Sequence, residues 1–485
     1  MQKQDITIVW LKRDLRLQDN EAIFNAVSTG LKVLFLYVFE PSLLNDKHYS
    51  QRHWNFIKES IHDINSRLSQ FNSKVLSVKG EVIPVFNMLL SKFNIKYVFS
   101  HQETGLKITF KRDKNFKRYC RNNLIVWKEN VNNGVFRGRK NRKDWVEDWN
   151  VYMNSQQFTY KLNNRLIELD VIDDIETIID VEKLLIKPIG VFQKGGTYTA
   201  KLYLKSFKEN RYINYAKYIS KPNEARISCS RLSPYFAWGN LSVRQVYQEF
   251  KEFRPISKNK RSIDCFLSRL RWQAHFIQKF EMECVMEEVS INRGFHKLKK
   301  DISEVYQLAW EAGKTGIPII DACIRCLKTT GYLNFRMRAM VVSFFVHNLW
   351  QPWQAASAFL SRLFLDFEPG IHFPQLQMQS GEVGVNTIRI YNPIKNGLDH
   401  DPDGTFIDKW VPELKHLPKP FKHEPYKMTV LEQNFYDFKR GEDYPEPIID
   451  VNTSRTKAVK IMWNMKKDDE VAKESSRILK KHVNR

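Results

Sequence analysis

The sequence contains no long apolar run and few cysteines. An apolar stretch such as 33–39 has the length of a strand, far below the roughly 18–20 residues that span a bilayer. The N-terminus lacks the apolar segment of a signal peptide. Six cysteines are scattered over 485 residues, which is typical of a reduced intracellular protein. We therefore expect a cytoplasmic monomer without membrane segments.

Two common ligand motifs are also missing. No GxGxxG follows the first predicted strand, so dinucleotide binding in the usual Rossmann manner is not supported. Cys323 and Cys326 form a CxxC, but they lie in a helical pattern and no second pair accompanies them. Core packing is the favoured interpretation, and no metal site is predicted.

Acidic residues are too few to balance the basic ones. The chain has 77 Lys and Arg against 54 Asp and Glu, a net charge of +23. Basic runs occur at 107–121, 137–143 and 258–261, and each taken alone is typical of a solvated surface. Their sum predicts a polyanionic partner, nucleic acid before an anionic membrane. Aromatic residues, 13% of the chain, suit stacking on unpaired bases.

The first 130 residues alternate short apolar runs with amphipathic segments. The apolar runs, expected as buried strands, are 6–11, 32–39, 74–78, 97–101 and 124–127. The amphipathic segments, expected as helices, are 19–27, 51–70, 82–93 and 106–120. This alternation predicts a doubly wound parallel sheet over residues 1–130.

The rest of the chain follows other patterns. Residues 131–195 are polar and weakly periodic, and we expect a connector that runs over the surface. Helical periods dominate residues 196–485, which predicts a large all-α domain. Within it, 333–353 is expected to be one buried helix, and the residues after 450 one basic amphipathic helix. The fold class is therefore α/β plus all-α.

Two clusters have side chains suited to binding. Ser228, Ser230 and Ser233 surround Arg231 before a helical segment, which indicates either an anion site or only a capped helix start. The helix predicted over 333–353 also needs acidic partners, because its buried pattern carries two arginines, Arg336 and Arg338.

The second cluster is acidic. Asp366 and Glu368 stand at a break before a Pro-Gly pair, and either carboxylate can neutralise Arg336 or Arg338. A buried ion pair is the simpler interpretation and a cofactor site the alternative.

Long segments of the chain resemble the photolyase/cryptochrome family. The segments are 10–20, 230–245 ("SRLSPYFAWGNLSVRQ"), 269–276 ("RLRWQAHF"), 313–353 and 386–418. The likeness runs from the first strand to about residue 450 in the family's order. It implies a bacterial, nucleoid-associated member, without the iron–sulfur cysteines of one branch because no cysteine follows Cys326.

The resemblance implies one FAD per chain, held in the helical domain. Arg338 matches the family arginine beside the flavin, and Asp366 matches the carboxylate that pairs with it. The positions implied to bind FAD are Ser230, Arg231, Leu232, Ser233, Gln273, Arg338, Asp366, Glu368 and His372. Glu103 lies where some relatives bind a folate, so it indicates either a second, antenna chromophore of unknown identity or a plain surface glutamate.

The resemblance also implies a reaction and a substrate. In photolyases, reduced flavin excited by blue light donates an electron to a cyclobutane pyrimidine dimer in UV-damaged DNA. Trp272 matches the tryptophan that stacks on the damaged bases, and Arg269 and Met378 lie at neighbouring lesion-facing positions. Trp353 matches the middle tryptophan of the electron relay, and Tyr391 and Trp350 are alternative electron donors.

Several departures from the family pattern leave the function open. His372 replaces the asparagine that faces flavin N5, where it contacts the ring or only packs, and Leu376 and Met378 replace two tryptophans. Arg269 replaces an acidic residue and cannot accept a hydrogen bond from the lesion. Asn334 and Phe335 stand where (6-4) photolyases carry a histidine pair, which disfavours that reaction. A dimer photolyase is favoured over a cryptochrome-like photoreceptor, and both over a flavin-free nucleic-acid-binding protein.

Overall fold

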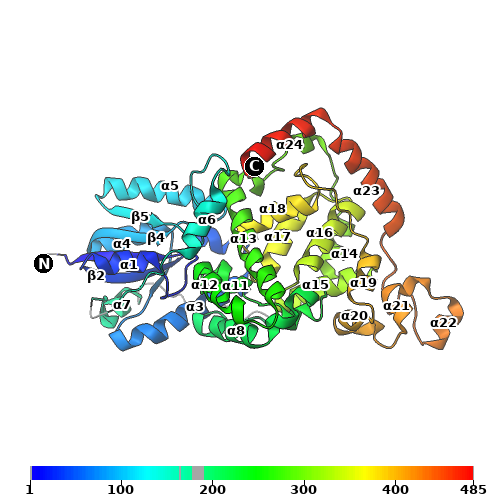
Figure 1. Ribbon diagram of the computed structural model, residues 1–485, viewed down its shortest axis with the longest axis horizontal. Coiled ribbons are helices and arrows are strands. Elements are labelled where there is room, and N and C mark those ends of the chain that lie inside the picture. The colour runs from blue at the N-terminus through cyan, green and yellow to red at the C-terminus, as the bar shows by residue number, and fades with distance from the viewer. Residues whose placement is uncertain (1–2, 163–164, 177–189, 484–485) are drawn as a thin grey trace.

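A parallel sheet lies beside a large helical body in the computed structural model, which describes residues 3–162, 165–176 and 190–483 (Figure 1). The sheet has five strands in the order β3-β2-β1-β4-β5, all parallel to their neighbours. The strands are β1 (Asp5–Leu11), β2 (Lys32–Phe39), β3 (Leu76–Lys79), β4 (Asn94–His101) and β5 (Val126–Asn130). The predicted class, α/β plus all-α, is confirmed.

The helices of the α/β part cover both faces of this sheet. They are α1 (Glu21–Ser28), α2 (Pro41–Leu44), α3 (Gln51–Leu68), α4 (Val82–Lys92) and α5 (Lys107–Asn122). Strands covered on both faces are apolar throughout, as β2 is. Because β1 pairs with both β2 and β4, the strand order reverses between β1 and β4, and the residues after these strands meet at one edge.

Helices make up most of the remaining chain. They are α6 (Trp145–Asn154), α7 (Leu169–Glu176), α8 (Thr197–Glu209), α9 (Tyr215–Tyr218), α10 (Ala225–Ser228), α11 (Ser233–Ala237), α12 (Val243–Phe253), α13 (Lys260–Met282), α14 (Glu304–Ala312), α15 (Pro318–Thr330), α16 (Phe335–Ser343), α17 (Trp353–Leu363), α18 (Pro369–Gln379), α19 (Pro393–His400), α20 (Thr405–Trp410), α21 (Lys419–His423), α22 (Val430–Phe435), α23 (Val451–Lys466) and α24 (Asp469–His482). Within the described ranges, no helix is both long and apolar enough to span a bilayer.

The stretch 333–353 is not the single helix that its periodicity predicts. Helix α16 passes into a π-helical turn, Phe344–Asn348, and the chain then breaks before α17. Trp350 has a left-handed backbone with φ of 54°, and Pro352 caps α17. A proline lacks an N–H and disfavours helix in the residue before it, so the helix cannot continue through this point.

Two other expectations about local structure need correction. The polar stretch after β5 contains helices α6 and α7, and Trp145 and Trp149 of α6 are buried; residues 163–164 and 177–189 of the predicted connector lie outside the described residues. The segment after 450 forms two helices and not one. The Asp468 side chain accepts hydrogen bonds from two backbone N–H groups and so starts α24.

His53 ties α3 to the helical body. Its Nδ1 accepts a hydrogen bond from the backbone N–H of Ser50 at 3.1 Å, and its Nε2 donates to the carbonyl of Phe364 at 2.9 Å. This arrangement fits only the neutral ring, because a protonated Nδ1 has no acceptor there. Burial lowers the pKa of His53 from 6.5 to about 3.

We expect His53 to make the fold sensitive to acid. Below its usual pKa the unfolded chain binds a proton that the folded protein refuses, so this group lowers the free energy of unfolding by about 1.4 kcal/mol per pH unit. The free energy of unfolding is measured with urea between pH 6.5 and 5. Its decrease per pH unit should be smaller in His53→Gln than in the parent, by about 1.4 kcal/mol. The exposed His62 is the control. Equal slopes for the parent, His53→Gln and His62→Gln would contradict the prediction.

Candidate functional site

The two arginines of α16 point to different partners. Arg338 Nη2 lies 2.8 Å from Asp366 Oδ2, and its Nε donates to the carbonyl of Leu333 at 2.8 Å. Arg336 Nη1 instead lies 3.4 Å from the hydroxyl of Tyr391. The pair expected between Arg338 and Asp366 is therefore present, just before the start of α18.

Several buried polar atoms around this pair have no hydrogen-bond partner. They are Oδ1 of Asp366, Nε of Arg231 and Oδ1 of Asn334. Because buried polar atoms are nearly always hydrogen-bonded, such a group of atoms indicates a polar ligand. Guanidinium donors suit a diphosphate, and the carboxylate and amide suit the polar edge of a ring, so these residues fit FAD.

The segment expected to bind phosphate has a strained backbone. Arg231 has φ of 60°, a conformation that few residues other than glycine adopt. Its guanidinium stacks 3.9 Å from the ring centroid of Tyr332 and donates to Gln193 Oε1 at 2.8 Å. Strain of this kind persists where the surrounding structure enforces it, commonly at ligand sites.

The other predicted members of the cofactor set are placed as follows. Ser230 Oγ accepts from the backbone N–H of Leu232 at 3.4 Å, and Leu232 is buried. Ser233 begins α11, and Gln273 is half-buried on α13. Their contacts with a cofactor remain predictions.

Glu368 faces the sheet domain. It occupies the N-cap position of α18 without a side-chain capping hydrogen bond. Its Oε2 lies 3.5 Å from Nη1 of Arg13, which follows β1. Burial raises the pKa of Glu368 to about 7, against the lowering effect of Arg13. The structure therefore brings Glu368 into contact with the edge of the sheet, where sequence reasoning had no reason to place it.

His372 packs inside the helical body. Its Nε2 lies 3.1 Å from the carbonyl oxygen of Ser357 and 3.2 Å from the Ser357 hydroxyl. The rings of Phe367 and Phe373 stand edge-on to it at 5.2 and 5.3 Å. Burial lowers the pKa of His372 to about 3, so the ring is neutral at pH 7. Its contact with flavin remains a prediction.

The three residues expected to face a lesion lie on two packed helices. Arg269 is exposed and Trp272 is 50% exposed on α13, and Met378 is half-buried on α18. The helices approach closely because Gly370 has no side chain: a Cβ there would lie 2.9 Å from the Cα of Ile277. Trp272 stacks on Phe276 at 5.8 Å, which holds the exposed indole in place.

The predicted electron donors differ in exposure. Trp353 is fully buried, as is Leu376, whereas Tyr391 and Trp350 are half-buried. The Trp353 indole donates to the hydroxyl of Ser290 at 3.1 Å. Sequence reasoning did not identify Ser290, because a lone serine outside any motif carries no signal.

Glu103 is occupied by ion pairs. It is buried, with Oε2 2.6 Å from Arg112 and Oε1 3.6 Å from Arg13. The cavity beside it has a volume of about 30 Å³. That is the space of one water molecule, whereas ring-sized ligands occupy pockets of roughly 300 Å³ or more. The antenna role of Glu103 stays a prediction.

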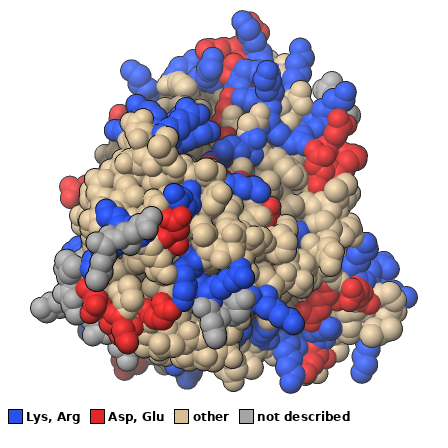
Figure 2. Space-filling model, turned by 90° about the vertical axis from the view of Figure 1, so that its left-hand side faces the viewer, with Lys and Arg blue, Asp and Glu red and all other residues tan. Residues whose placement is uncertain are grey.

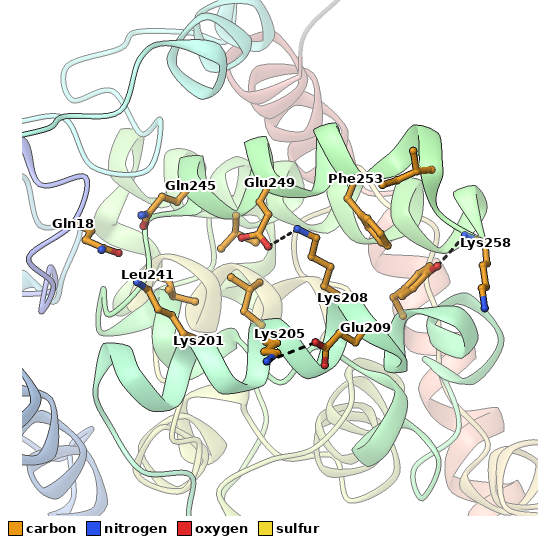
Figure 3. Close-up of a pocket in the computed structure, with 14 residues that line it drawn as sticks. Gln18, Lys201, Lys205, Lys208, Glu209, Leu241, Gln245, Glu249, Phe253 and Lys258 are labelled. Atoms are coloured by element: carbon orange, nitrogen blue, oxygen red, sulfur yellow. Dashed lines mark hydrogen bonds and ion pairs between the residues drawn. The ribbon is translucent and has the colours of Figure 1, made fainter.

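A larger groove lies between α8 and α12 (Figure 3). Its volume is about 710 Å³, and its lining includes Lys201, Lys205, Lys208 and Lys258. Lys208 pairs with Glu249 across it at 2.9 Å. None of its lining residues belongs to the predicted flavin or lesion sites, so size alone does not identify the reactive site.

Comparison with known proteins agrees with this geometry. A model described as "FAD binding domain of DNA photolyase" matches residues 266–464, and one described as "DNA photolyase" matches residues 7–141. The chain belongs to the photolyase/cryptochrome family. It therefore contains an FAD-binding domain of the photolyase type, and that domain includes Trp272, Arg338 and Asp366.

Relatives in this family carry both photolyase and cryptochrome names. The chain is 25% identical to a cryptochrome DASH of Synechocystis sp., over 92% of this chain and 96% of the relative. It is 32% identical to a deoxyribodipyrimidine photo-lyase of Alkalihalophilus pseudofirmus, but this match covers half of each chain. The crystal structure of a Synechocystis cryptochrome superposes with a TM-score of 0.84 at 21% identity, covering 95% of this chain and all of that one.

Proposed function

We propose that this family member is a DNA photolyase that splits cyclobutane pyrimidine dimers under blue light. The observation that carries the proposal is the half-exposed Trp272, held on α13 next to α18, whose start follows the Arg338–Asp366 pair. An exposed indole on a basic protein suits stacking on an extruded base. A dimer stacks and pairs poorly, so its extrusion from the duplex requires less energy than that of an intact base.

Each side chain of the site has a part in this proposal. Arg338, oriented by Asp366, holds a positive charge beside the flavin ring and so favours its anionic reduced form. His372 is a neutral ring in the same region, because burial lowers its pKa to about 3. Arg231 pairs with the diphosphate. Reduced FAD, when bound and excited by light, supplies the electron that opens the cyclobutane ring.

The net charge of +23 supports binding to phosphates on both sides of the lesion. Basic side chains are not restricted to one area, however. On the face of the α/β domain, Lys and Arg are interspersed with Asp and Glu (Figure 2). The net charge therefore supports DNA as the partner, but it does not show where DNA binds. In this proposal, the position of Trp272 locates the DNA-binding site.

A cryptochrome-like photoreceptor is the second candidate function. The exposed Arg269 beside Trp272 favours it, because an arginine cannot accept the hydrogen bonds that lesion bases offer. A photoreceptor of this kind binds irradiated and undamaged DNA alike through phosphates, with an affinity that falls steeply as salt rises.

Repair of a defined dimer separates the two candidates. Purified protein, chemically reduced so that no internal electron relay is needed, is mixed with a single-stranded oligonucleotide containing one thymine cyclobutane dimer. We expect intact thymines to reappear under blue light and not in the dark. If a protein with bound, reduced FAD gives no repair in the light, the photolyase proposal is wrong and the photoreceptor is favoured.

A further inference from the structure

The indole N–H of Trp353 leads through a hydroxyl to a buried carboxylate. Trp353 Nε1 donates to Ser290 Oγ at 3.1 Å, and Ser290 Oγ donates to Glu382 Oε2 at 2.5 Å. All three residues are buried, with 0%, 5% and 6% of their surface exposed. Water therefore has little access to this path, and the carboxylate is the base that the indole proton can reach.

Other indoles in the described part of the chain have different surroundings. The Nε1 atoms of four have no hydrogen-bond partner, namely Trp145, Trp149, Trp310 and Trp410. Trp238 donates to the carbonyl of Leu365, which is too weak a base to take the proton. Trp127, in the sheet domain, donates to the Ser100 hydroxyl. The Trp353 arrangement is thus not a common feature of indoles in this fold.

Lys300 places a positive charge close to Trp350. Its ammonium lies 3.3 Å from Glu382 Oε1 and 4.8 Å from the ring centroid of Trp350. Trp350 is three residues from Trp353, so their Cα atoms are at most about 11 Å apart, close enough for electron transfer. An ammonium above a ring repels a positive charge that forms on that ring. Trp350 is therefore a poor place for an electron hole to move to.

We propose that Ser290 and Glu382 form a proton relay that traps the oxidised state of Trp353, while Lys300 prevents the hole from moving to Trp350. This inference rests on the proposed function, which requires FAD in its reduced form. The one-electron oxidant of Trp353 is oxidised FAD excited by light, a different redox state from the reduced FAD that repairs the dimer. Trp353 gives one electron to that oxidant. Its Nε1 proton passes to Ser290 Oγ as the Ser290 hydroxyl proton passes to Glu382. The products are a neutral Trp353 radical and a protonated Glu382. Ser290 and Glu382 are positioning residues, because they act through Trp353.

Flash photolysis of the FAD-loaded protein tests the relay. Transient absorption distinguishes a tryptophan radical cation from the neutral radical, and Trp353→Phe identifies the signal. We expect Ser290→Ala to slow conversion of cation to neutral radical by about 100-fold, since it removes a positioned proton acceptor. Ser290→Thr keeps a hydroxyl and should restore the rate, and Trp350→Phe should leave it unchanged. Ser290→Ala leaves both partners of the Lys300–Glu382 pair in place, so we expect the fold to be preserved.

Two results would overturn the inference. One is conversion at the parent rate in Ser290→Ala, and the other is loss of the radical signal in Trp350→Phe. A second excitation, with an external ruthenium polypyridyl oxidant, separates the relay from the proposed function. If the conversion depends on Ser290 with the external oxidant, the relay is upheld. If no Trp353 radical forms in the same protein with flavin as the oxidant, electron transfer from Trp353 to the flavin is contradicted.

Discussion

Arg338→Gln should release FAD on gel filtration, whereas we expect the parent protein to retain it. Arg338 is the cation paired with Asp366 at 2.8 Å, and its removal leaves a buried carboxylate, with 6% of its side chain exposed, without its counter-charge. Removing one partner of a buried pair costs about 3 kcal/mol or more; we expect bound FAD to increase the burial of Asp366, so that most of this cost falls on the FAD-bound state and lowers the affinity by roughly 100-fold. Titration of the apoprotein with FAD, followed by flavin fluorescence, measures this loss.

The same helix provides a matched control for that experiment. Arg336 lies two residues earlier on α16 and contacts Tyr391 instead of Asp366. Arg336→Gln removes the same charge from the same helix, so it should keep FAD affinity within a few-fold of the parent. Equal loss in both variants would indicate a general weakening of α16. Unchanged affinity in Arg338→Gln would mean that the Arg338–Asp366 pair does not hold the cofactor.

Regular elements were predictable where local sequence decides the conformation. The apolar run 32–39 predicts a strand, and β2 has those bounds. The amphipathic pattern at 82–93 predicts a helix, and α4 ends one residue earlier. In such segments periodicity and strand or helix propensity agree, so the local pattern is sufficient.

Breaks inside apolar stretches were not predictable in the same way. The periodic pattern of 333–353 continues through the π-helical turn and across Trp350, because both sides of the break are buried. Periodicity reports which residues face the core and is insensitive to a change of direction between two buried helices. Pro352 was the available signal, since proline commonly occupies the start of a helix.

Contacts between residues far apart in the sequence limited how much of the site could be predicted. The Arg338–Asp366 pair followed from the resemblance, because both positions lie in the family's motifs. Arg13 meets Glu368 and Glu103 only because the sheet edge packs against the start of α18. Long-range packing of this kind leaves no periodic or local trace. The pairing of Glu103 with Arg112 and the proton path from Trp353 were therefore visible only in three dimensions.

Trp272→Ala should abolish the preference for irradiated DNA and leave FAD bound. Stacking of a base on an aromatic side chain contributes about 1–3 kcal/mol, so loss of the indole should weaken lesion binding by roughly 5- to 150-fold. Affinity for undamaged DNA, which depends on phosphates, should stay near the parent value. Fluorescence anisotropy with a dimer-containing and an undamaged oligonucleotide, at one fixed salt concentration, gives the ratio of the two affinities.

Trp463 on α23 is the control for loss of an exposed indole. It is 44% exposed, close to the 50% of Trp272, but lies outside every predicted site. Trp463→Ala should therefore retain the lesion preference. If Trp272→Ala releases FAD instead, α13 supports the flavin pocket and the indole is not a lesion platform. If neither variant changes the ratio, lesion binding does not use Trp272. The photoreceptor would then be the favoured function. Its DNA binding depends on phosphates and a basic surface, and it requires no aromatic platform for an extruded base.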